Sequence, residues 1–498
     1  MKTIIETRLG QVIGLQYEGY QEYLGLRYAQ PPVENSRYEP PVLITSWEIP
    51  YDATKVGPIA PQAHEDDPPI NLEENEDCLF LNIWTPNADE VKRPVMVYIH
   101  GGAFVIGSAS RPRIHGGKLS KRGNVVVVNI QYRLGMLGFL NFKGISPNLG
   151  LQDQICALQW IQENIKSFGG DPNNVTVFGE SAGAMSLGLL MLSPKASGLF
   201  HKGIAQSGAI DFDHMETDLK NSQNSARKFL NRLKIDPIDS RILKTLPIEK
   251  LIQAERNTMK GSFLIDRLFF PFPDRNIIPF DYEKAWKTGH ARKIPLLIGM
   301  NAEELPLFST NLIPSKLKQF IAKFFIMRGI RKVTGFSKHQ FEELIRVYKK
   351  NYHPPDYPKN AEYDMLLTDI AFWLFTNKQA ELHSSIQDTY MYVLNYKAPK
   401  INASPHVFDL LFVFGNLTSK DVAEGIRLEG TAIEQHLREQ IMDAWISFAQ
   451  NGDPNHKELP NWPKFDTIKR YTMIFDSPCN IIENPKEEIR LVWKNLVT

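Results

Sequence analysis

The sequence has few cysteines, almost no net charge and no long hydrophobic run. Its 498 residues include only three cysteines, too few for a fold held together by disulfides. Lys and Arg number 57 and Asp and Glu 56, so no overall charge would draw the chain to nucleic acid or to an anionic membrane. No apolar stretch approaches the length that spans a bilayer, and Glu6 and Arg8 interrupt the N-terminal run that a secretory leader would need. We therefore expect a cytoplasmic protein with no nucleic-acid partner and no membrane span.

The sequence also has no motif typical of a bound metal or a nucleotide cofactor. It contains no HExxH, no paired CxxC, no Walker A sequence and no G-x-G-x-x-G after a predicted strand. We find no internal repeat and no low-complexity tract. The prediction is that the protein uses neither a metal nor a cofactor.

Short apolar runs alternate with helical patterns along much of the chain. Helical spacing is clear at residues 151–167 and 182–192. The apolar runs are 95–100, 125–130, 175–178, 203–206, 295–300, 389–395 and 471–475. Runs that are apolar on both faces and separated by helices indicate the α/β class, with a large, mostly parallel central sheet flanked by helices.

The rest of the chain is expected to add to this sheet without forming a separate domain. The first 50 residues, rich in Tyr, Pro and Gly, predict additional edge strands. Residues 212–290 and 306–385 are mostly helical and charged in pattern, and no Gly/Ser linker separates them from their neighbours. We expect one domain over residues 1–498, with these two segments as helical insertions that form a cap.

The sharpest local motif is Gly179-Glu180-Ser181-Ala182-Gly183, which fits G-x-S-x-G. An apolar run precedes it and a helical pattern follows it. A serine hydroxyl is a weak nucleophile unless it is exposed, oriented and next to a base, and a sharp strand-to-helix turn provides the exposure. The flanking glycines suit a turn that has no room for side chains. The motif predicts that Ser181 is a nucleophile, although a solvated serine in a small-residue turn has the same pattern.

A second glycine pair, Gly101-Gly102, follows His100 at the end of the apolar run 95–99. Acyl transfer builds negative charge on a carbonyl oxygen, and fixed backbone N–H groups stabilise that charge. Alone, the pair would be an ordinary turn after a strand. Paired with the serine motif, it matches the arrangement of lipases and esterases. We predict that the oxyanion donors are Gly101, Gly102 and Ala182.

Longer blocks of the sequence resemble the type-B carboxylesterases, and within them the bacterial para-nitrobenzyl esterase branch. The two signatures of that family are similar to residues 76–86 (EDCLFLNIWTP) and 168–183, the second of which contains Ser181. Further similar blocks lie at 25–29, 132–135, 148–154, 406–415, 443–449 and 452–455. The blocks run from about residue 8 to about residue 465. The resemblance implies the α/β-hydrolase fold, with the helical insertions as a cap over an active-site gorge.

The same resemblance implies the two partners of the serine. The family's histidine lies in a block like 406–415, which makes His406 the base; composition alone could not choose it among 12 histidines. The family's acid follows a strand, and Glu304 matches it, with the adjacent Glu303 as the alternative. Leu305 stands where many members have Gly. The chain order serine, acid, histidine is the order of α/β-hydrolases.

The resemblance also suggests a substrate pocket, although core packing is the alternative for every residue in it. The segment 269–274 (FFPFPD) is similar to one that passes near the acyl pocket in the family. The candidate pocket residues are Phe104, Phe270, Phe272 and Phe412. Residues 307–330 combine apolar and basic side chains, which fits either a cap helix or a helix at a membrane surface. The resemblance implies that the cysteine matching Cys78 forms a loop disulfide in secreted relatives. This sequence has no cysteine where the partner would lie, so we expect that disulfide to be absent.

Together these features predict a serine carboxylesterase, a carboxylic-ester hydrolase that cleaves small to medium apolar acyl or aryl esters through an acyl-enzyme. A lipase or an amidase is the alternative within the enzyme class. A non-catalytic scaffold is the alternative outside it, because this fold also has such members. We expect a monomer or a weak homo-oligomer whose only partner is the small-molecule ester.

Overall fold

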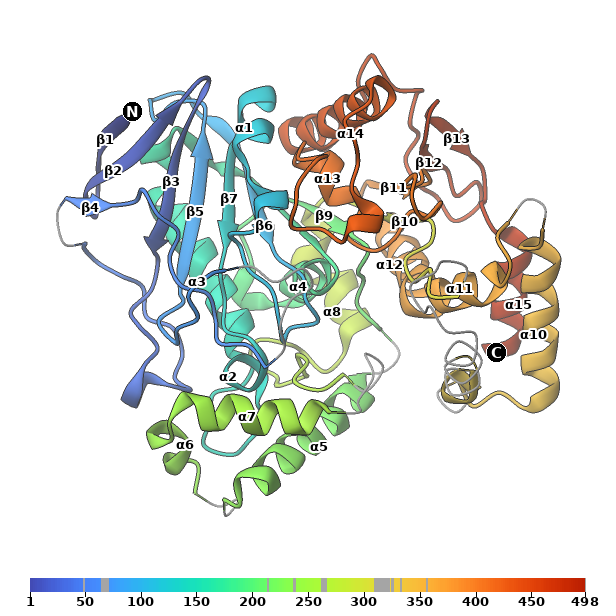
Figure 1. Ribbon diagram of the computed structural model, residues 1–498, viewed down its shortest axis with the longest axis horizontal. Helices are drawn as coiled ribbons and strands as arrows, with labels where there is room; N and C mark the ends of the chain where they lie inside the picture. Colours follow the sequence, from blue (N-terminus) through green and yellow to red (C-terminus); the bar gives the residue numbers. More distant parts are fainter. Residues whose placement is uncertain are drawn as a thin grey trace.

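The computed structural model describes residues 1–47, 50–63, 71–212, 215–235, 239–260, 267–308, 323, 327–331, 334–354 and 357–497. One large sheet forms its centre, and Figure 1 shows helices packed on both sides of this sheet. The strands are β1 (Lys2–Thr7), β2 (Gly10–Tyr17), β3 (Tyr20–Arg27), β4 (Tyr51–Asp52), β5 (Phe80–Thr85), β6 (Arg93–Ile99), β7 (Val126–Ile130), β8 (Gly170–Glu180), β9 (Lys202–Gln206), β10 (Leu296–Asn301), β11 (Thr389–Leu394), β12 (Thr472–Phe475) and β13 (Asn480–Ile482).

The order of the strands is β1-β2-β3-β5-β7-β6-β8-β9-β10-β11-β12-β13, with β4 on β2. Every pair from β7 to β12 is parallel, whereas β1, β2, β3 and β5 join on one side, and β13 on the other, in antiparallel pairs. The predicted parallel centre and the N-terminal edge strands are therefore confirmed. The apolar runs coincide with the central strands β6 to β12.

The helices enter between the strands in the order that the alternating pattern predicts. They are α1 (Gly117–Gly123), α2 (Gly135–Phe139), α3 (Leu149–Asn164), α4 (Ala182–Leu192), α5 (Met215–Leu233), α6 (Arg241–Thr245), α7 (Ile248–Met259), α8 (Tyr282–Thr288), α10 (Lys338–Asn351), α11 (Ala361–Thr368), α12 (Leu374–Ser384), α13 (Asp409–Val413), α14 (Ala432–Asn451) and α15 (Glu487–Val497). A π-helical turn, η7 (Asp369–Trp373), joins α11 to α12.

Strand β6 shows why this sheet is covered on both faces. Val95, Val97 and Ile99 belong to a buried cluster that includes residues of α3 and α4. Met96 and Tyr98 point the other way, into a second cluster with residues of α13 and α14. Successive side chains of a strand face opposite sides, so a strand that is apolar at every position needs helices on both sides.

The two predicted insertions are helical where they are described. Helices α5 to α8 lie between β9 and β10, and α10 to α12 lie between β10 and β11. In Figure 1, α5, α6 and α7 group together at the lower edge, while α10 and α15 form a separate group at the right. Most of the segment 307–330 falls outside the described residues, so its two interpretations remain predictions.

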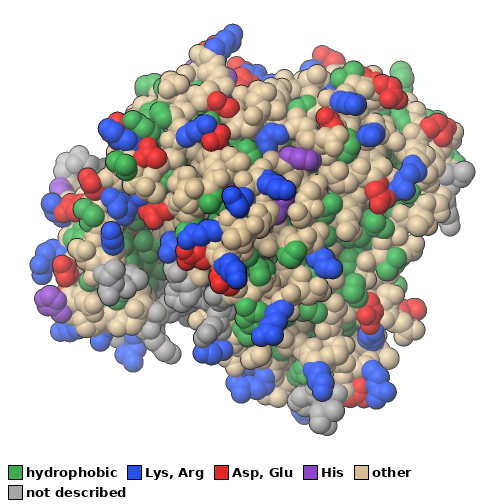
Figure 2. Space-filling model, turned by 180° about the vertical axis from the view of Figure 1, so that it is seen from behind, with side chains coloured by type: hydrophobic (Ala, Val, Ile, Leu, Met, Phe, Trp, Pro, Cys, Tyr) green, Lys and Arg blue, Asp and Glu red, His purple; other side chains and the backbone are tan. Residues whose placement is uncertain are grey.

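The surface carries both signs of charge. The view from behind in Figure 2 shows Lys and Arg side chains spread over the face, with Asp and Glu among them. Among the described residues, no helix has the length and apolar character to cross a membrane. Within the same ranges, no cluster of three or more His, Cys, Asp or Glu side chains is arranged to hold a metal ion.

Candidate active site

Ser181 stands at the turn between the end of β8 and the start of α4. Its backbone has φ 56° and ψ −122°, a conformation that a residue with a Cβ rarely adopts. Two hydrogen bonds hold it there: the Ser181 N–H donates to the Gln206 carbonyl at 2.9 Å, and the Met185 N–H donates to the Ser181 carbonyl at 3.0 Å. The serine is half-buried, whereas Ala182 after it is buried. The backbone thus lifts the hydroxyl above the sheet.

The glycines around the serine are required by crowding between backbone segments. A Cβ on Gly183 would lie 2.0 Å from the Ile99 carbonyl oxygen, and one on Gly179 would lie 2.5 Å from the Gly183 carbonyl carbon. Both distances are far shorter than any real contact of a Cβ. The elbow therefore packs directly on the carboxyl end of β6, where the Gly101-Gly102 pair begins.

The Gly101-Gly102 loop closes over the same point. A Cβ on Gly101 would lie 3.0 Å from Cβ of Ser181, so this glycine is in direct contact with the serine. Gly102 has φ +113° and receives the N–H groups of Val105 and Ile106 on its carbonyl oxygen, each at 3.0 Å. The structure therefore brings the Gly101-Gly102 loop and Ala182, the first residue of α4, to the same serine.

His406 reaches this place from the other half of the chain and contacts Glu304. Its Nδ1 is 2.7 Å from Oε2 of Glu304, and its N–H donates to the Glu304 carbonyl at 3.1 Å. The other carboxylate oxygen of Glu304 accepts hydrogen bonds from the Ser207 hydroxyl at 2.6 Å and from the Asn301 N–H at 2.7 Å.

The alternative acid, Glu303, faces away from the histidine. It pairs with Lys397 and accepts a hydrogen bond from the Ser404 N–H. The acid beside the histidine is thus Glu304.

The second nitrogen of the imidazole faces a carboxylate as well. Nε2 of His406 is 3.0 Å from Oε1 of Glu180, the residue directly before Ser181. Burial lowers the pKa of His406, but Glu180 and Glu304 together outweigh it and hold this pKa well above its usual range. Burial, with the charge of Glu180, raises the pKa of nearby Asp409 to about 7. The imidazole of His406 therefore contacts two buried carboxylates, and the third buried carboxyl group, that of Asp409, is close enough to Glu180 to feel its charge.

Comparison with known proteins agrees with this geometry. A model of the Carboxylesterase family matches residues 1–493. The chain is 36% identical to the para-nitrobenzyl esterase of Bacillus subtilis over 98% of this chain and 97% of that protein. It is 31% identical to carboxylesterase 1F of Mus musculus over 95% of this chain and 90% of that one.

The chain belongs to the carboxylesterase family.

Solved structures agree with this assignment over the whole length. A PNB esterase structure superposes with a TM-score of 0.83 at 34% identity, covering 98% of this chain and 99% of that one. A carboxylesterase of Geobacillus stearothermophilus superposes with a TM-score of 0.84 at 33% identity, covering 99% and 100%. The fold is therefore the predicted α/β-hydrolase fold, and the protein is a carboxylic-ester hydrolase.

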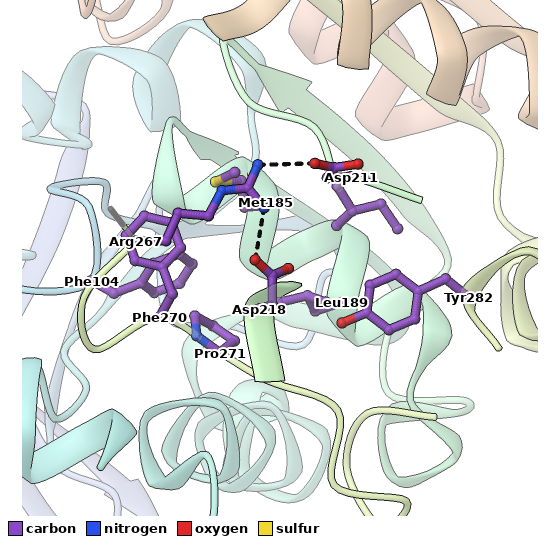
Figure 3. A pocket seen from close by; sticks show the side chains of 10 residues that line it. Phe104, Met185, Leu189, Asp211, Asp218, Arg267, Phe270, Pro271 and Tyr282 are labelled. Atoms are coloured by element: carbon purple, nitrogen blue, oxygen red, sulfur yellow. Dashed lines mark hydrogen bonds and ion pairs between the residues drawn. The ribbon is translucent and has the colours of Figure 1, made fainter. Parts of the chain in front are cut away.

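The four predicted pocket residues of this carboxylesterase separate into two groups. Phe104 and Phe270 line one cavity, with their rings 5.0 Å apart, and Figure 3 shows them beside Met185 of α4. Phe272 and Phe412 are buried and do not line that cavity. Phe412 packs on Phe408 and Tyr396 in the cluster of α13 and α14, which places it in the core.

A charged group shares the cavity with these aromatic side chains. Arg267 pairs with Asp211 at 3.1 Å and with Asp218 at 2.8 Å, as the dashed lines of Figure 3 mark. Burial opposes the charge of Arg267, yet its pKa is raised because both carboxylates face it. The cavity thus combines apolar walls with a compensated cluster of charges.

Sequence reasoning missed several residues of the site. Ser207 follows β9 directly, and a serine at the carboxyl end of the strand next to β8, the strand that leads to Ser181, was the available signal. Asp409, three residues after the histidine, accepts hydrogen bonds from the Gln206 side chain at 2.8 Å and the Tyr392 hydroxyl at 2.9 Å. Phe372 packs on the His406 ring with no sequence motif to announce it.

Proposed function

We propose that this carboxylesterase hydrolyses its ester by a serine mechanism, with Ser181 as nucleophile, His406 as base and Glu304 as the partner of the base. The contact of 2.7 Å between His406 Nδ1 and Glu304 Oε2, directly beside a serine at a strand-to-helix elbow, is the observation that carries the proposal. Glu304 keeps the proton on Nδ1, which leaves Nε2 free to accept one. Ser207 and Asn301 hold the opposite oxygen of Glu304 and so prevent the carboxylate from turning away.

In the first half of the reaction, Nε2 leaves its contact with Glu180 and accepts the proton of the Ser181 hydroxyl. The hydroxyl oxygen attacks the ester carbonyl, and the N–H groups of Gly101, Gly102 and Ala182 stabilise the negative oxygen that forms. The protonated imidazole then gives its proton to the departing alcohol. Water enters, the same groups act in reverse order, and the acid leaves the enzyme.

The cavity of Figure 3 is the proposed site of the acyl chain. Phe104 comes two residues after Gly102, and Met185 lies one helical turn after Ser181, so the cavity borders both the oxyanion loop and the nucleophile's helix. The cavity measures only about 30 Å³, so its aromatic side chains must move apart to admit the small to medium apolar acyl group that its apolar walls favour. The cluster of Arg267 with Asp211 and Asp218 resists a long apolar chain, because burying charges beside it without water is costly.

The test is hydrolysis of p-nitrophenyl esters from acetate to palmitate by the wild type and by Ser181→Ala. We expect turnover to be highest for short and medium chains and to fall by about 10⁶-fold in the variant, as for other enzymes that lose this nucleophile. A fluorophosphonate probe should label the wild type at Ser181 and leave the variant unlabelled.

Three other results would contradict the proposal, each in its own way. Preference for emulsified long-chain esters would indicate a lipase, and faster cleavage of anilides than of matching esters would indicate an amidase. Activity that survives Ser181→Ala would exclude Ser181 as the nucleophile. A folded wild type without activity on any ester would favour the scaffold function.

The broader expectations are part of the same proposal. We propose a bacterial, cytoplasmic enzyme that works as one domain, as a monomer or a weak homo-oligomer. The Bacillus subtilis relative supports the bacterial source. Sedimentation at several concentrations tests the oligomeric state.

A further inference from the structure

The helix that faces the catalytic histidine is interrupted at the point of contact. Residues 361–384 run as α11, the π-helical turn η7 and α12, and η7 carries Phe372. The Phe372 ring lies over the imidazole of His406, with centroids 4.8 Å apart and planes at 40°. A π-helical turn is rare and costs helical stability, and such turns occur often at functional sites. Here the turn determines where the aromatic ring meets the base.

The same helix is bonded to the loop of the acid. The Thr368 hydroxyl, one residue before η7, accepts the Leu305 N–H at 3.4 Å, and Leu305 directly follows Glu304. One turn earlier, the Asp364 carboxylate accepts the Phe308 N–H at 2.8 Å. The helix therefore contacts both the ring of the base and the segment that leaves the acid.

A buried charge anchors the first residue of the π-helical turn. Asp369 is completely buried, and both of its carboxylate oxygens have partners. Lys486 donates to one at 2.6 Å, and the Tyr348 hydroxyl donates to the other at 2.6 Å. The Tyr348 oxygen in turn accepts the indole N–H of Trp493 at 2.9 Å. The anchor of the turn is thus a chain of side chains that ends in the C-terminal segment of the protein.

Two of these side chains belong to residues at α15, far along the sequence from the site. Lys486 directly precedes α15, and Trp493 lies within it. The Lys486 ammonium also lies 5.6 Å from the centre of the Trp373 ring, at the other end of η7. A buried carboxylate that loses its only ammonium partner becomes strongly unfavourable. Without Lys486, Asp369 would either take up a proton or move toward water, and in both cases the turn would lose the ion pair that fixes its first residue.

We propose that Lys486 and Trp493 are positioning residues for His406, which act by holding the π-helical turn so that Phe372 fixes the imidazole. The proposal rests on the proposed function, because it assumes that His406 is the base. Phe372 keeps the ring in the plane that Glu304 and Ser181 require. The C-terminal helix, remote from the substrate, then determines how precisely the proton is delivered.

A displaced His406 would slow different esters to different extents, whereas a general loss of stability would lower all rates alike. An ester of ethanol releases a strongly basic alkoxide, which must be protonated by the imidazolium as it leaves. An ester of p-nitrophenol releases a weakly basic phenolate that needs little help. A loosened His406 should therefore slow acylation by alkyl esters more than acylation by nitrophenyl esters.

The experiment compares kcat/KM, which reports acylation, for ethyl butyrate and p-nitrophenyl butyrate. Rates are referred to the concentration of active sites, counted with the fluorophosphonate probe. For Lys486→Met we expect kcat/KM to fall about tenfold for the ethyl ester and less than about threefold for the nitrophenyl ester. Lys486→Arg keeps the charge and should restore most of the loss. The control is Lys350→Met, which removes the exposed ion pair of Lys350 with Glu488 between α10 and α15, the helices that carry Tyr348 and Trp493.

Phe372→Leu and Trp493→Phe provide the same comparison if Lys486→Met does not fold. Both should lower the ethyl ester rate selectively, the first more than the second. Equal losses on the two esters, or no loss beyond that of Lys350→Met, would overturn the proposal. Failure of the proposed function is distinguishable, because Ser181→Ala would then retain activity on both esters whatever the Lys486 variants do.

Discussion

The two halves of the active site are held in different ways. The proposed nucleophile and oxyanion donors come from residues 99–104 and 179–183, where backbone packs so closely on backbone that the glycines leave no room for a Cβ. The proposed acid and base come from loops after β10 and β11, where side-chain hydrogen bonds and ring contacts hold Glu304 and His406. The first half is rigid through steric exclusion, and the second through a network.

This difference suits the chemistry of each half. The oxyanion donors must stay fixed while charge develops, because reorganisation at that moment would cost catalysis. In the proposed mechanism the imidazole exchanges a proton with Ser181, the leaving alcohol and water. Its surroundings must therefore orient the ring and still allow it to shift between these partners. A network whose links can be weakened one at a time provides that support.

Among variants that keep both Ser181 and His406, the largest effect should come from the network half. Glu304→Gln keeps the size of the side chain but removes the charge that stabilises the imidazolium, and the amide favours the wrong tautomer. We expect kcat to fall by about 10⁴-fold, the loss seen when the acid of another serine triad is replaced by its amide. Glu303→Gln is the matched control and should cost only a few-fold. Equal losses of kcat in the two variants would show that the contact with His406 does not identify Glu304 as the acid.

The next effect comes from the backbone half. Gly183→Ala places a Cβ 2.0 Å from the Ile99 carbonyl oxygen, so β6 and the elbow must separate. We expect a loss of about 100-fold in kcat/KM, the cost of misplacing reacting groups by about 1 Å. Thermal unfolding should show a destabilisation of about 3 kcal/mol. Gly329→Ala, where no described atom lies within 4 Å and the backbone is helical, should leave kcat/KM unchanged and should not lower the free energy of unfolding. A Gly183→Ala enzyme with normal kinetics would contradict the steric account.

The same contrast explains what could be predicted from the sequence. Where backbone segments are crowded, the sequence itself carries the signal, because Gly179, Gly183, Gly101 and Gly102 leave no room for a Cβ. Short motifs therefore predicted the elbow of Ser181 and the Gly101-Gly102 loop, which the structure places together. Strands that are apolar on both faces likewise predicted a covered parallel sheet. Both features depend on neighbours in the sequence.

The residues of the side-chain network around His406 share no local sequence motif. His406 and Glu304 are 102 residues apart, and only the family resemblance could select one histidine among 12. Ser207, Asp409 and Phe372 come from three further elements and have no shared motif. Phe412 shows the converse problem, because a buried aromatic residue has the same local pattern whether it lines a cavity or packs in the core.

The smallest effect tests how the network tunes the base. Only neutral His406 can accept the serine proton, so kcat/KM falls as pH drops through the pKa of this histidine. Glu180 and Glu304 raise that pKa despite burial, so the activity of the wild type should begin to fall at a pH well above the ordinary histidine value. Glu180→Gln removes one of the two charges and lowers the pKa. The acid limb of the pH profile should therefore move to lower pH by about one unit.

In this measurement, the effect of Glu180 on the pH profile must be distinguished from that of Asp409. Burial, with the charge of Glu180, raises the pKa of Asp409 to about 7, so this carboxyl group also changes charge within the pH range of the measurement. Asp409→Asn removes this titration and leaves Glu180 and Glu304 facing the imidazole. If the limb belongs to His406, Asp409→Asn should move it much less than Glu180→Gln does. If only Asp409→Asn moves the acid limb, the pH dependence of kcat/KM belongs to the buried Asp409 carboxyl group and not to His406.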